Sequence, residues 1–303
     1  MTGSTAGFGY ITQTWLPLLA AITIGVQVGI SIVLTRAVAD DIGPVSLTFL
    51  RYAVAALCLV PVVLVTTRRR IGSRDILPIA MLGLVQFGLL ILLLNMGLRG
   101  VPAGPGALLF ATSPLFALVL GVLKGQERWS GRRLTGIIIA LTSLTLVLGS
   151  GDAVPAGVIS VAGATQILGA AACAAVAGTF LGPFVRRYGA PPVSAVAMLA
   201  TVAMLAGPAL ANDVTGEVRT MDDGVAGAVV ALGIGSGIGY LLWLWALKSI
   251  DASTVTAFLM LSPVTALIAG AIFLDEAITI TAAVGMALLG AGLWASTRAR
   301  PKA

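Results

Sequence analysis

The chain has 303 residues, of which 58% are hydrophobic and only 10% are charged, whereas a soluble domain is about 25% charged. This balance excludes an ordinary soluble protein and a disordered chain. The net charge of +6 comes from short basic clusters between apolar runs. Because a nucleic-acid-binding protein gathers its basic residues on one patch, no nucleic-acid partner is expected.

Long uncharged runs follow one another along the chain, separated by short charged segments. A helix needs about 20 apolar residues to cross a bilayer, and these runs lack the alternation of β-barrel strands. We therefore predict an all-α membrane protein with ten transmembrane helices. In chain order the predicted spans are 17–38, 44–66, 76–97, 104–123, 134–150, 163–184, 191–211, 226–247, 253–273 and 278–297.

The basic residues between the spans predict the orientation of the protein in the membrane. Lys and Arg number 14 in the even-numbered loops and the C-terminal segment, but 3 in the odd-numbered loops. Positively charged loops stay in the cytoplasm, so both termini are expected there, in a bacterial inner membrane. Residues 1–16 carry no basic n-region of a cleavable signal, so the first span is expected to be retained.

The second half of the chain repeats the first. The segment 113–127 matches 262–276 at six identical positions, each offset by 149 residues. We predict two related halves, 1–150 and 151–303, with five spans each. Because five is odd, the second half must cross the membrane the other way up, which is the inverted-topology repeat of many secondary transporters.

The repeated segments carry a family pattern. Residues 245–296 contain an aromatic-Ala-Leu, a short loop, an Ala that starts the next helix, a mid-helix Pro and a Glu before a Gly-rich helix. Residues 95–136 repeat this order, and Leu50-Arg51-Tyr52 lies in the second span. The set resembles the EamA-type drug/metabolite transporter superfamily, which implies a ten-helix transporter, often an exporter of amino acids or other small metabolites. Residues 95–97 depart from the aromatic-Ala-Leu pattern, so the resemblance leaves the substrate open.

Polar side chains inside spans are costly and usually face the interior. Gln27 and Ser31 continue a stripe that begins at Thr23, and Ser236, Tyr240 and Trp243 share a face that suits a zwitterion with an apolar side chain. Alternatively, the hydroxyls bond the preceding helical turn and the aromatic rings serve packing. Gln86 and Asn95 point to opposite faces, so at most one should line a cavity. The predicted substrate pathway comprises Gln27, Ser31, Gln86, Asn95, Ser113, Ser236, Tyr240, Trp243 and Ser262.

Two prolines and three charged residues have a predicted mechanical role. Pro114 and Pro263 lie near the middle of corresponding spans, where proline kinks a helix, and are either hinges or static bends. Glu127 and Glu276 end corresponding helices as a gate or coupling site, or as charges that favour the dipole of the following helix. Arg51 lies about 10 Å into the second span at 1.5 Å per residue. We expect it to be an anchor that snorkels to the surface in preference to a substrate clamp.

The chain has no His, and none of its 12 acidic residues lies in the middle of a span. A proton-coupled transporter usually keeps such a group within the membrane, so we predict a uniporter, with coupling through Glu127 and Glu276 as the alternative. The predicted function is amino-acid or metabolite export by alternating access. A multidrug or lipophilic-compound exporter is the second possibility and a non-transporting membrane scaffold the third. An enzyme is not expected, nor a cofactor or metal, and the protein should be a monomer or homodimer in the lipid bilayer.

Overall fold

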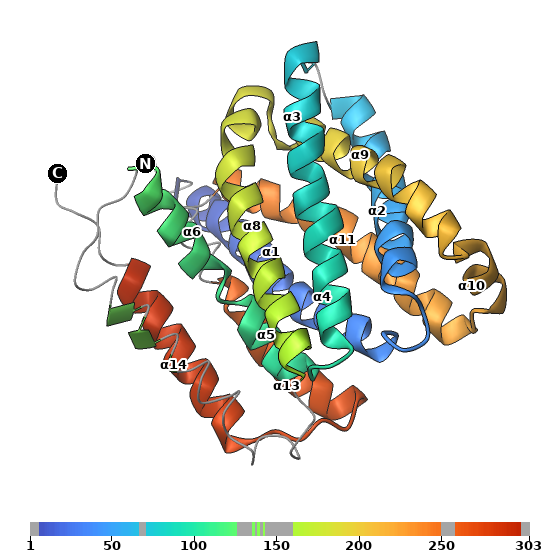
Figure 1. Cartoon of the computed structure of the whole chain (residues 1–303). Coiled ribbons are helices and arrows are strands. Elements are labelled where there is room, and N and C mark those ends of the chain that lie inside the picture. Colours follow the sequence, from blue (N-terminus) through green and yellow to red (C-terminus); the bar gives the residue numbers. More distant parts are fainter. Residues whose placement is uncertain are drawn as a thin grey trace.

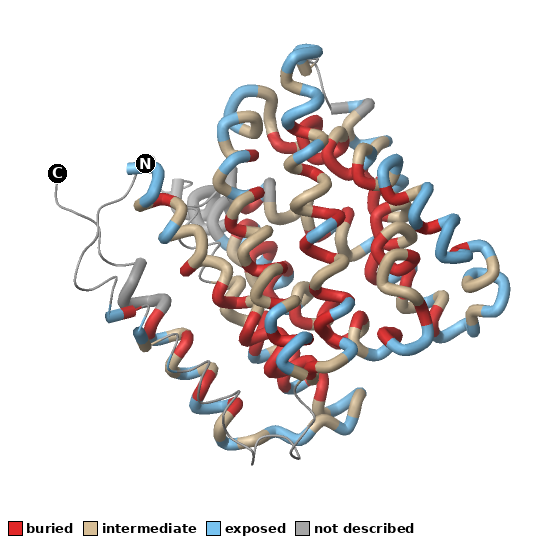
Figure 2. Tube along the Cα trace, in the orientation of Figure 1, coloured by how far each residue is buried: buried red, intermediate tan, exposed pale blue. Residues whose placement is uncertain are grey.

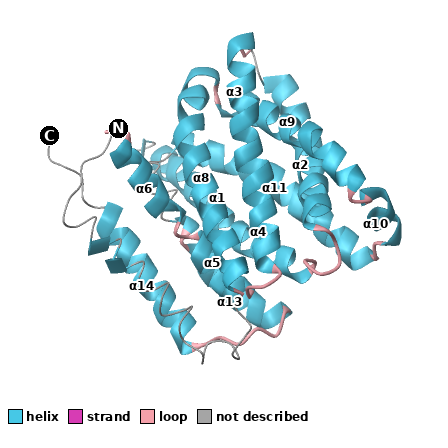
Figure 3. Ribbon diagram, in the orientation of Figure 1, coloured by secondary structure: helices cyan, strands magenta, loops and turns pink. Residues whose placement is uncertain are grey.

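The computed structural model describes residues 6–66, 71–125, 160–249 and 258–297, together with positions 135, 136, 138, 139 and 142. These residues form helices joined by turns and loops, without a strand in the described ranges (Figure 3). In chain order the elements are α1 (Ala6–Ala37), α2 (Pro44–Thr66), α3 (Ser73–Gly83), the π-helix η1 (Leu84–Leu89), α4 (Leu90–Leu98), α5 (Ala103–Phe110), α6 (Ser113–Leu123), α8 (Val161–Tyr188), α9 (Ala190–Ala211), α10 (Val214–Thr220), α11 (Asp223–Ser249), α13 (Leu261–Phe273) and α14 (Ile280–Thr297).

The membrane spans agree with the hydropathy pattern. Seven helical stretches of the described chain are long and apolar enough to cross a membrane, and α13 and α14 are shorter apolar helices. They coincide with the predicted spans except in two places: the fifth, 134–150, lies outside the described residues apart from five positions, and so do residues 253–257 of the ninth. The predicted all-α membrane fold is confirmed. The short helix α10, which lies in the loop between α9 and α11, was not predicted.

Apolar side chains cover the outside of the bundle as well as its centre. Leu57 is 75% exposed, Val65 87% and Ile280 82%, and such a large apolar surface needs a membrane or a partner to cover it. Buried residues concentrate along the middle of the bundle (Figure 2). The outward-facing apolar residues therefore suit contact with lipid.

Small residues let the helices of the interior approach closely. A Cβ atom added to Gly233 of α11 would lie 2.4 Å from Cβ of Val54 on α2. A Cβ atom added to Gly239, six residues later, would lie 2.7 Å from Oε1 of Gln27 on α1. The glycines that alternate along α11 thus allow close packing against two neighbouring helices.

The helices pair reciprocally across the two halves of the chain (Figure 1). The first span, α1, packs against α11 and α13, and its counterpart α8 packs against α4 and α6. Likewise, α2 packs against α11 while its counterpart α9 packs against α3, and α2 and α9 pack against each other. Such an exchange of helices is expected if the two halves of the chain are structural repeats.

Candidate functional site

A cavity of about 240 Å³ lies within the bundle, bordered by α1, α2, η1, α4 and α11, with single residues from α5, α8, α9 and the segment just before α13. Leu90, Ile91 and Leu94 form part of its apolar wall. The lining also contains eight side chains that carry polar groups: Gln27, Ser31, Arg51, Tyr52, Gln86, Ser236, Tyr240 and Trp243. These side chains come from both halves of the chain, so the cavity is built jointly by them.

The α1 side of the cavity presents two polar groups one helical turn apart. The side-chain amide of Gln27 donates from Nε2 to Oγ of Ser31 over 2.8 Å, and Gly235 and Gly239 of α11 make room for the Gln27 side chain. Both predicted pathway residues lie in the lining. Thr23, one turn earlier, is exposed and does not line the cavity.

A guanidinium group of α2 also lies at the cavity. Arg51 is only 8% exposed, and its Nε donates to Oγ of Ser236 over 2.7 Å. The Ser236 hydroxyl in turn donates to the carbonyl of Leu232 over 2.7 Å. Because its own proton is used inside α11, the hydroxyl accepts the bond from Arg51 and fixes the guanidinium at the cavity. The expectation that Arg51 snorkels to the surface is wrong: it is buried, because Ser236 and the cavity provide it with a polar environment.

Four aromatic rings form a continuous row along the cavity. The ring centroids of Tyr52 and Phe87 are 5.2 Å apart, those of Phe87 and Tyr240 are 5.6 Å apart, and those of Tyr240 and Trp243 are 5.5 Å apart. Tilted and edge-on pairs of this kind are favourable. The row gives the cavity a rigid apolar wall next to its polar groups.

Gln86 and Asn95 lie in different environments, although both occupy the third span. Gln86 belongs to η1 and lines the cavity. Asn95 is buried in α4 away from the lining, where its Nδ2 donates to Oγ1 of Thr48 over 3.0 Å and to the carbonyl of Pro44 over 3.4 Å. The structure therefore places one of the two amides at the cavity, while the other joins α4 to α2.

The corresponding Ser-Pro pairs lie beside the cavity without lining it. The fourth span is interrupted at residues 111–112, and Pro114 lies in the first turn of α6; Pro263 lies in the first turn of α13. Ser113 and Ser262 are not among the lining residues. Because proline has no N–H, residues 110 and 259 lose the helical donor four positions on, and both Phe110 and Leu259 line the cavity.

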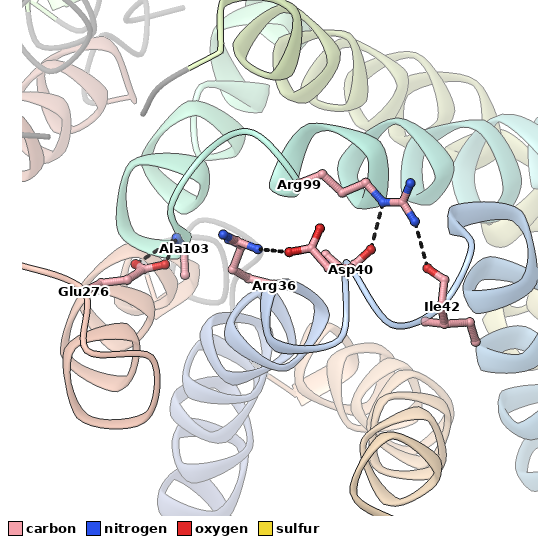
Figure 4. A network of polar contacts seen from close by, with 7 residues as sticks. Arg36, Asp40, Ile42, Arg99, Ala103 and Glu276 are labelled. Carbon is pink, nitrogen blue, oxygen red and sulfur yellow. Dashed lines mark hydrogen bonds and ion pairs between the residues drawn. The ribbon is translucent and has the colours of Figure 1, made fainter. Parts of the chain in front are cut away.

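Polar contacts tie the two halves together at one end of the bundle (Figure 4). The Glu276 carboxylate accepts bonds from the backbone N–H of Ala103 at 2.9 Å to each oxygen. Close by, Arg99 donates from Nε to the carbonyl of Ala39 over 2.8 Å and from Nη2 to that of Ile42 over 3.0 Å. Residues from the ends of α1, α4 and α13 and the start of α5 thus form a polar cluster.

Glu276 does lie at a helix N-terminus, but not at the expected one. Its sequence position predicts an interaction with the dipole of the following helix, α14. Instead its carboxylate reaches the N-terminus of α5, in the other half of the chain, where the first N–H groups of a helix have no partner of their own. The corresponding Glu127 lies outside the described residues.

Sequence reasoning missed Tyr52 and Phe87 and misplaced Arg51. Neither ring belongs to a polar stripe, and the η1 distortion that turns Gln86 and Phe87 to the cavity leaves no mark in the hydropathy pattern. The sequence did mark Arg51 as unusual, because it is a charged residue inside a predicted span. Among the described residues no group of three His, Cys, Asp or Glu side chains has the arrangement of a metal site.

Comparison with known proteins points to one family. The sequence profile of the EamA-like transporter family matches the chain twice, at residues 15–149 and 161–298. An uncharacterized transporter of Archaeoglobus fulgidus is 26% identical over 262 residues, which cover 86% of this chain and 90% of that protein. A probable terminal-alkyne amino-acid exporter of Streptantibioticus cattleyicolor is 29% identical over 288 residues, covering 92% and 88% of the two chains. One crystal structure of 20% identity has a similar fold, with a TM-score of 0.62 over 91% of this chain and 96% of that one.

Proposed function

Because the chain belongs to the EamA-like transporter family, we propose that it is a secondary transporter that exports small organic solutes by alternating access, with amino acids as the first candidates. The family is one of transporters and not of enzymes, and the protein is a multi-pass membrane protein. The proposal concerns the mechanism, the substrate class and the direction of transport.

The observation that carries the proposal is the central cavity and its mixed lining. Amide, hydroxyl and guanidinium groups meet a row of aromatic rings there, and ligand sites combine a few polar groups with apolar walls in this way. Helices of both halves border the cavity, so a movement of one half against the other would change its access. An amino acid with an apolar side chain matches both kinds of surface. The amino-acid exporter named among the relatives supports this substrate class.

The charges of the lining favour uniport of such a solute. None of the described lining residues is an Asp, Glu or His, so this lining offers no titratable group of the kind that proton-coupled carriers keep in the membrane. A lipophilic cation would meet the Arg51 guanidinium with no carboxylate to balance it, which disfavours the multidrug alternative. Coupling through Glu127 and Glu276 at the membrane boundary is the alternative to uniport.

The placement in the cell follows from the loop charges. The excess of Lys and Arg in the even-numbered loops supports cytoplasmic termini in a bacterial inner membrane. On this orientation the polar cluster of Glu276 and Arg99 faces the outside of the cell. The proposal applies equally to a monomer and to a homodimer.

The test is counterflow of a labelled amino-acid panel in proteoliposomes that contain only the purified protein. We expect saturable flux of apolar or aromatic amino acids that an imposed pH gradient leaves unchanged, and empty liposomes are the control. Flux that requires the gradient would contradict uniport. If no amino acid moves, but lipophilic compounds do, the drug-exporter alternative replaces the amino-acid proposal; no flux with either panel would favour a scaffold.

A further inference from the structure

We infer that the Arg51 guanidinium binds the carboxylate of the transported solute, so that a free carboxylate, and not an ammonium group, is the feature that the cavity recognises. The inference rests on the proposed function, because it takes the central cavity as the transport site, and it narrows the substrate class to singly charged carboxylates with an apolar body. An α-amino acid belongs to this class, and so does its deaminated analogue.

The first argument is that Arg51 lacks a counter-ion. Within the described part of the chain, no carboxylate forms an ion pair with it, and the ion pairs there use Arg36 and Arg187 instead. Removing an ionised group from water without a partner is expensive. A buried, unpaired cation at a cavity is therefore best explained by an anion that arrives with the substrate.

The second argument is the way the guanidinium is held. Its Nε is occupied by Ser236, whose hydroxyl is in turn fixed by the Leu232 carbonyl, while its two terminal Nη groups make no hydrogen bond to the described residues. Two parallel N–H donors of this kind match the two oxygens of a carboxylate. Ser236 is therefore a positioning residue: it orients the guanidinium through Nε and leaves the two Nη groups to donate to the substrate.

The third argument is the charge balance of the whole lining. Arg51 is the one Lys or Arg among the lining residues, so a single negative charge neutralises it. A phosphate monoester carries close to two negative charges, so one of them would have no positive partner in the described lining. The described lining contains no Asp or Glu, so a substrate ammonium finds only neutral partners there, the oxygens of Gln27, Ser31 and Gln86 and the aromatic faces, which attract it less than a carboxylate would. The ammonium should therefore add little to the binding affinity, whereas loss of the carboxylate should lower it strongly.

The experiment measures binding to the purified protein in detergent by isothermal titration calorimetry. The probes are L-phenylalanine, 3-phenylpropionate, which lacks the ammonium group, and L-phenylalaninamide, which lacks the carboxylate. We expect the two carboxylates to bind with similar Kd and the amide to bind at least about tenfold more weakly, because a hydrogen-bonded charge pair contributes about 1.5–3 kcal/mol. Equal binding of amide and acid, much weaker binding of 3-phenylpropionate than of L-phenylalanine, or no binding of either acid would overturn the inference.

Variants separate recognition from folding. Arg51→Met should remove the preference for acid over amide. Arg51→Lys keeps the positive charge but lacks the two parallel N–H donors of the guanidinium, so it should weaken binding of the acids about tenfold. Arg36→Met is the matched control, because Arg36 forms an exposed ion pair with Asp40 at the end of α1 and should keep the full preference. Ser236→Ala should reduce the preference, and Ser236→Thr, which restores a hydroxyl, should recover it. A preference that survives in Arg51→Met would exclude this role for Arg51.

The same preparations in proteoliposomes distinguish the inference from the proposed function. Binding that depends on Arg51, without flux of either acid, would refute transport of these solutes but keep the carboxylate site. Flux in which amide and acid compete equally would keep the transporter and refute the carboxylate site.

Discussion

Gln27 and Asn95 are both amides within membrane spans, but their surroundings give them different tasks. Gln27 lines the cavity, and within the described part of the chain its side chain bonds to Ser31, one turn away on the same helix. Asn95 is 2% exposed and bonds to Thr48 on another helix, while its Oδ1 has no hydrogen-bond partner among the described residues. The first amide is placed to meet a solute, whereas the second connects α4 to α2.

Substitution of these two amides should therefore affect the KM for the transported solute differently. Gln27→Ala removes a polar group from the lining and should raise the KM for the transported solute about threefold to tenfold, which corresponds to one neutral hydrogen bond of about 0.5–1.5 kcal/mol. Asn95→Leu should leave the KM unchanged, since the side chain does not face the cavity. Counterflow kinetics give both values, with thermal unfolding as a control for stability. A larger KM change in Asn95→Leu than in Gln27→Ala would contradict this assignment.

Helical periodicity predicted individual lining residues when they lay on regular helix. The spacing of Gln27 and Ser31, and of Ser236 and Tyr240, was sufficient to bring each pair to one face, and the structure places all four at the cavity. Periodicity gave no information on Tyr52, because an aromatic residue in an apolar run has no distinguishing pattern. Which side of a helix faces the cavity depends on the neighbouring helices. For this reason the sequence could not show that Ser113 and Ser262 lie outside the lining.

At the scale of the element, two distorted spans contribute to the site. The third span contains η1, and π-helical turns of this kind frequently occur at functional sites; Gln86 and Phe87 lie within it. The fourth span breaks just before Pro114, and both residues that lose a helical donor to the paired prolines line the cavity. The breaks could be anticipated from proline chemistry, but η1 could not, because no proline or charge marks it in the sequence.

The N-terminus of α5 provides a test of the contacts between the halves. Glu276 bonds to the N–H of Ala103, and a carboxylate at this place also favours the helix dipole by about 0.3–1 kcal/mol. Glu276→Gln keeps one acceptor oxygen but loses the charge, so amide hydrogen exchange at the start of α5 should become about fivefold faster. Hydrogen–deuterium exchange with peptides that cover residues 103–110 measures this change.

Glu217 offers the matched control for that variant. Its Oε1 accepts a bond from the N–H of Gly43 at the start of α2, so Glu217→Gln should alter exchange there and leave α5 as it is. Under uniport, Glu276→Gln should also retain most of the flux. Unchanged exchange at α5 would argue against stabilisation of the α5 N-terminus by Glu276. Complete loss of flux would indicate that Glu276 takes part in coupling.

For the whole molecule, hydropathy and the repeat offset of 149 residues were enough to predict the helical membrane fold and its duplicated sequence. They could not predict which helices meet, because lipid-facing and interior faces are almost equally apolar in these spans. The reciprocal pairing of α1 with α13 and of α8 with α6 supplies that missing arrangement. The proposed alternating access depends on this pairing, since each half then holds a helix of the other in the same way.

The most direct test of the account asks whether the cavity is reached from both sides of the membrane. In a background in which Cys58 and Cys173 are replaced by alanine, Gln27→Cys provides a single thiol in the lining. A membrane-impermeant thiol reagent is applied to right-side-out and to inverted vesicles, with and without 3-phenylpropionate. Alternating access predicts labelling from both sides and protection by the carboxylate in each case. Labelling from one side only, or labelling that the carboxylate leaves unchanged on both sides, would contradict a central transport site.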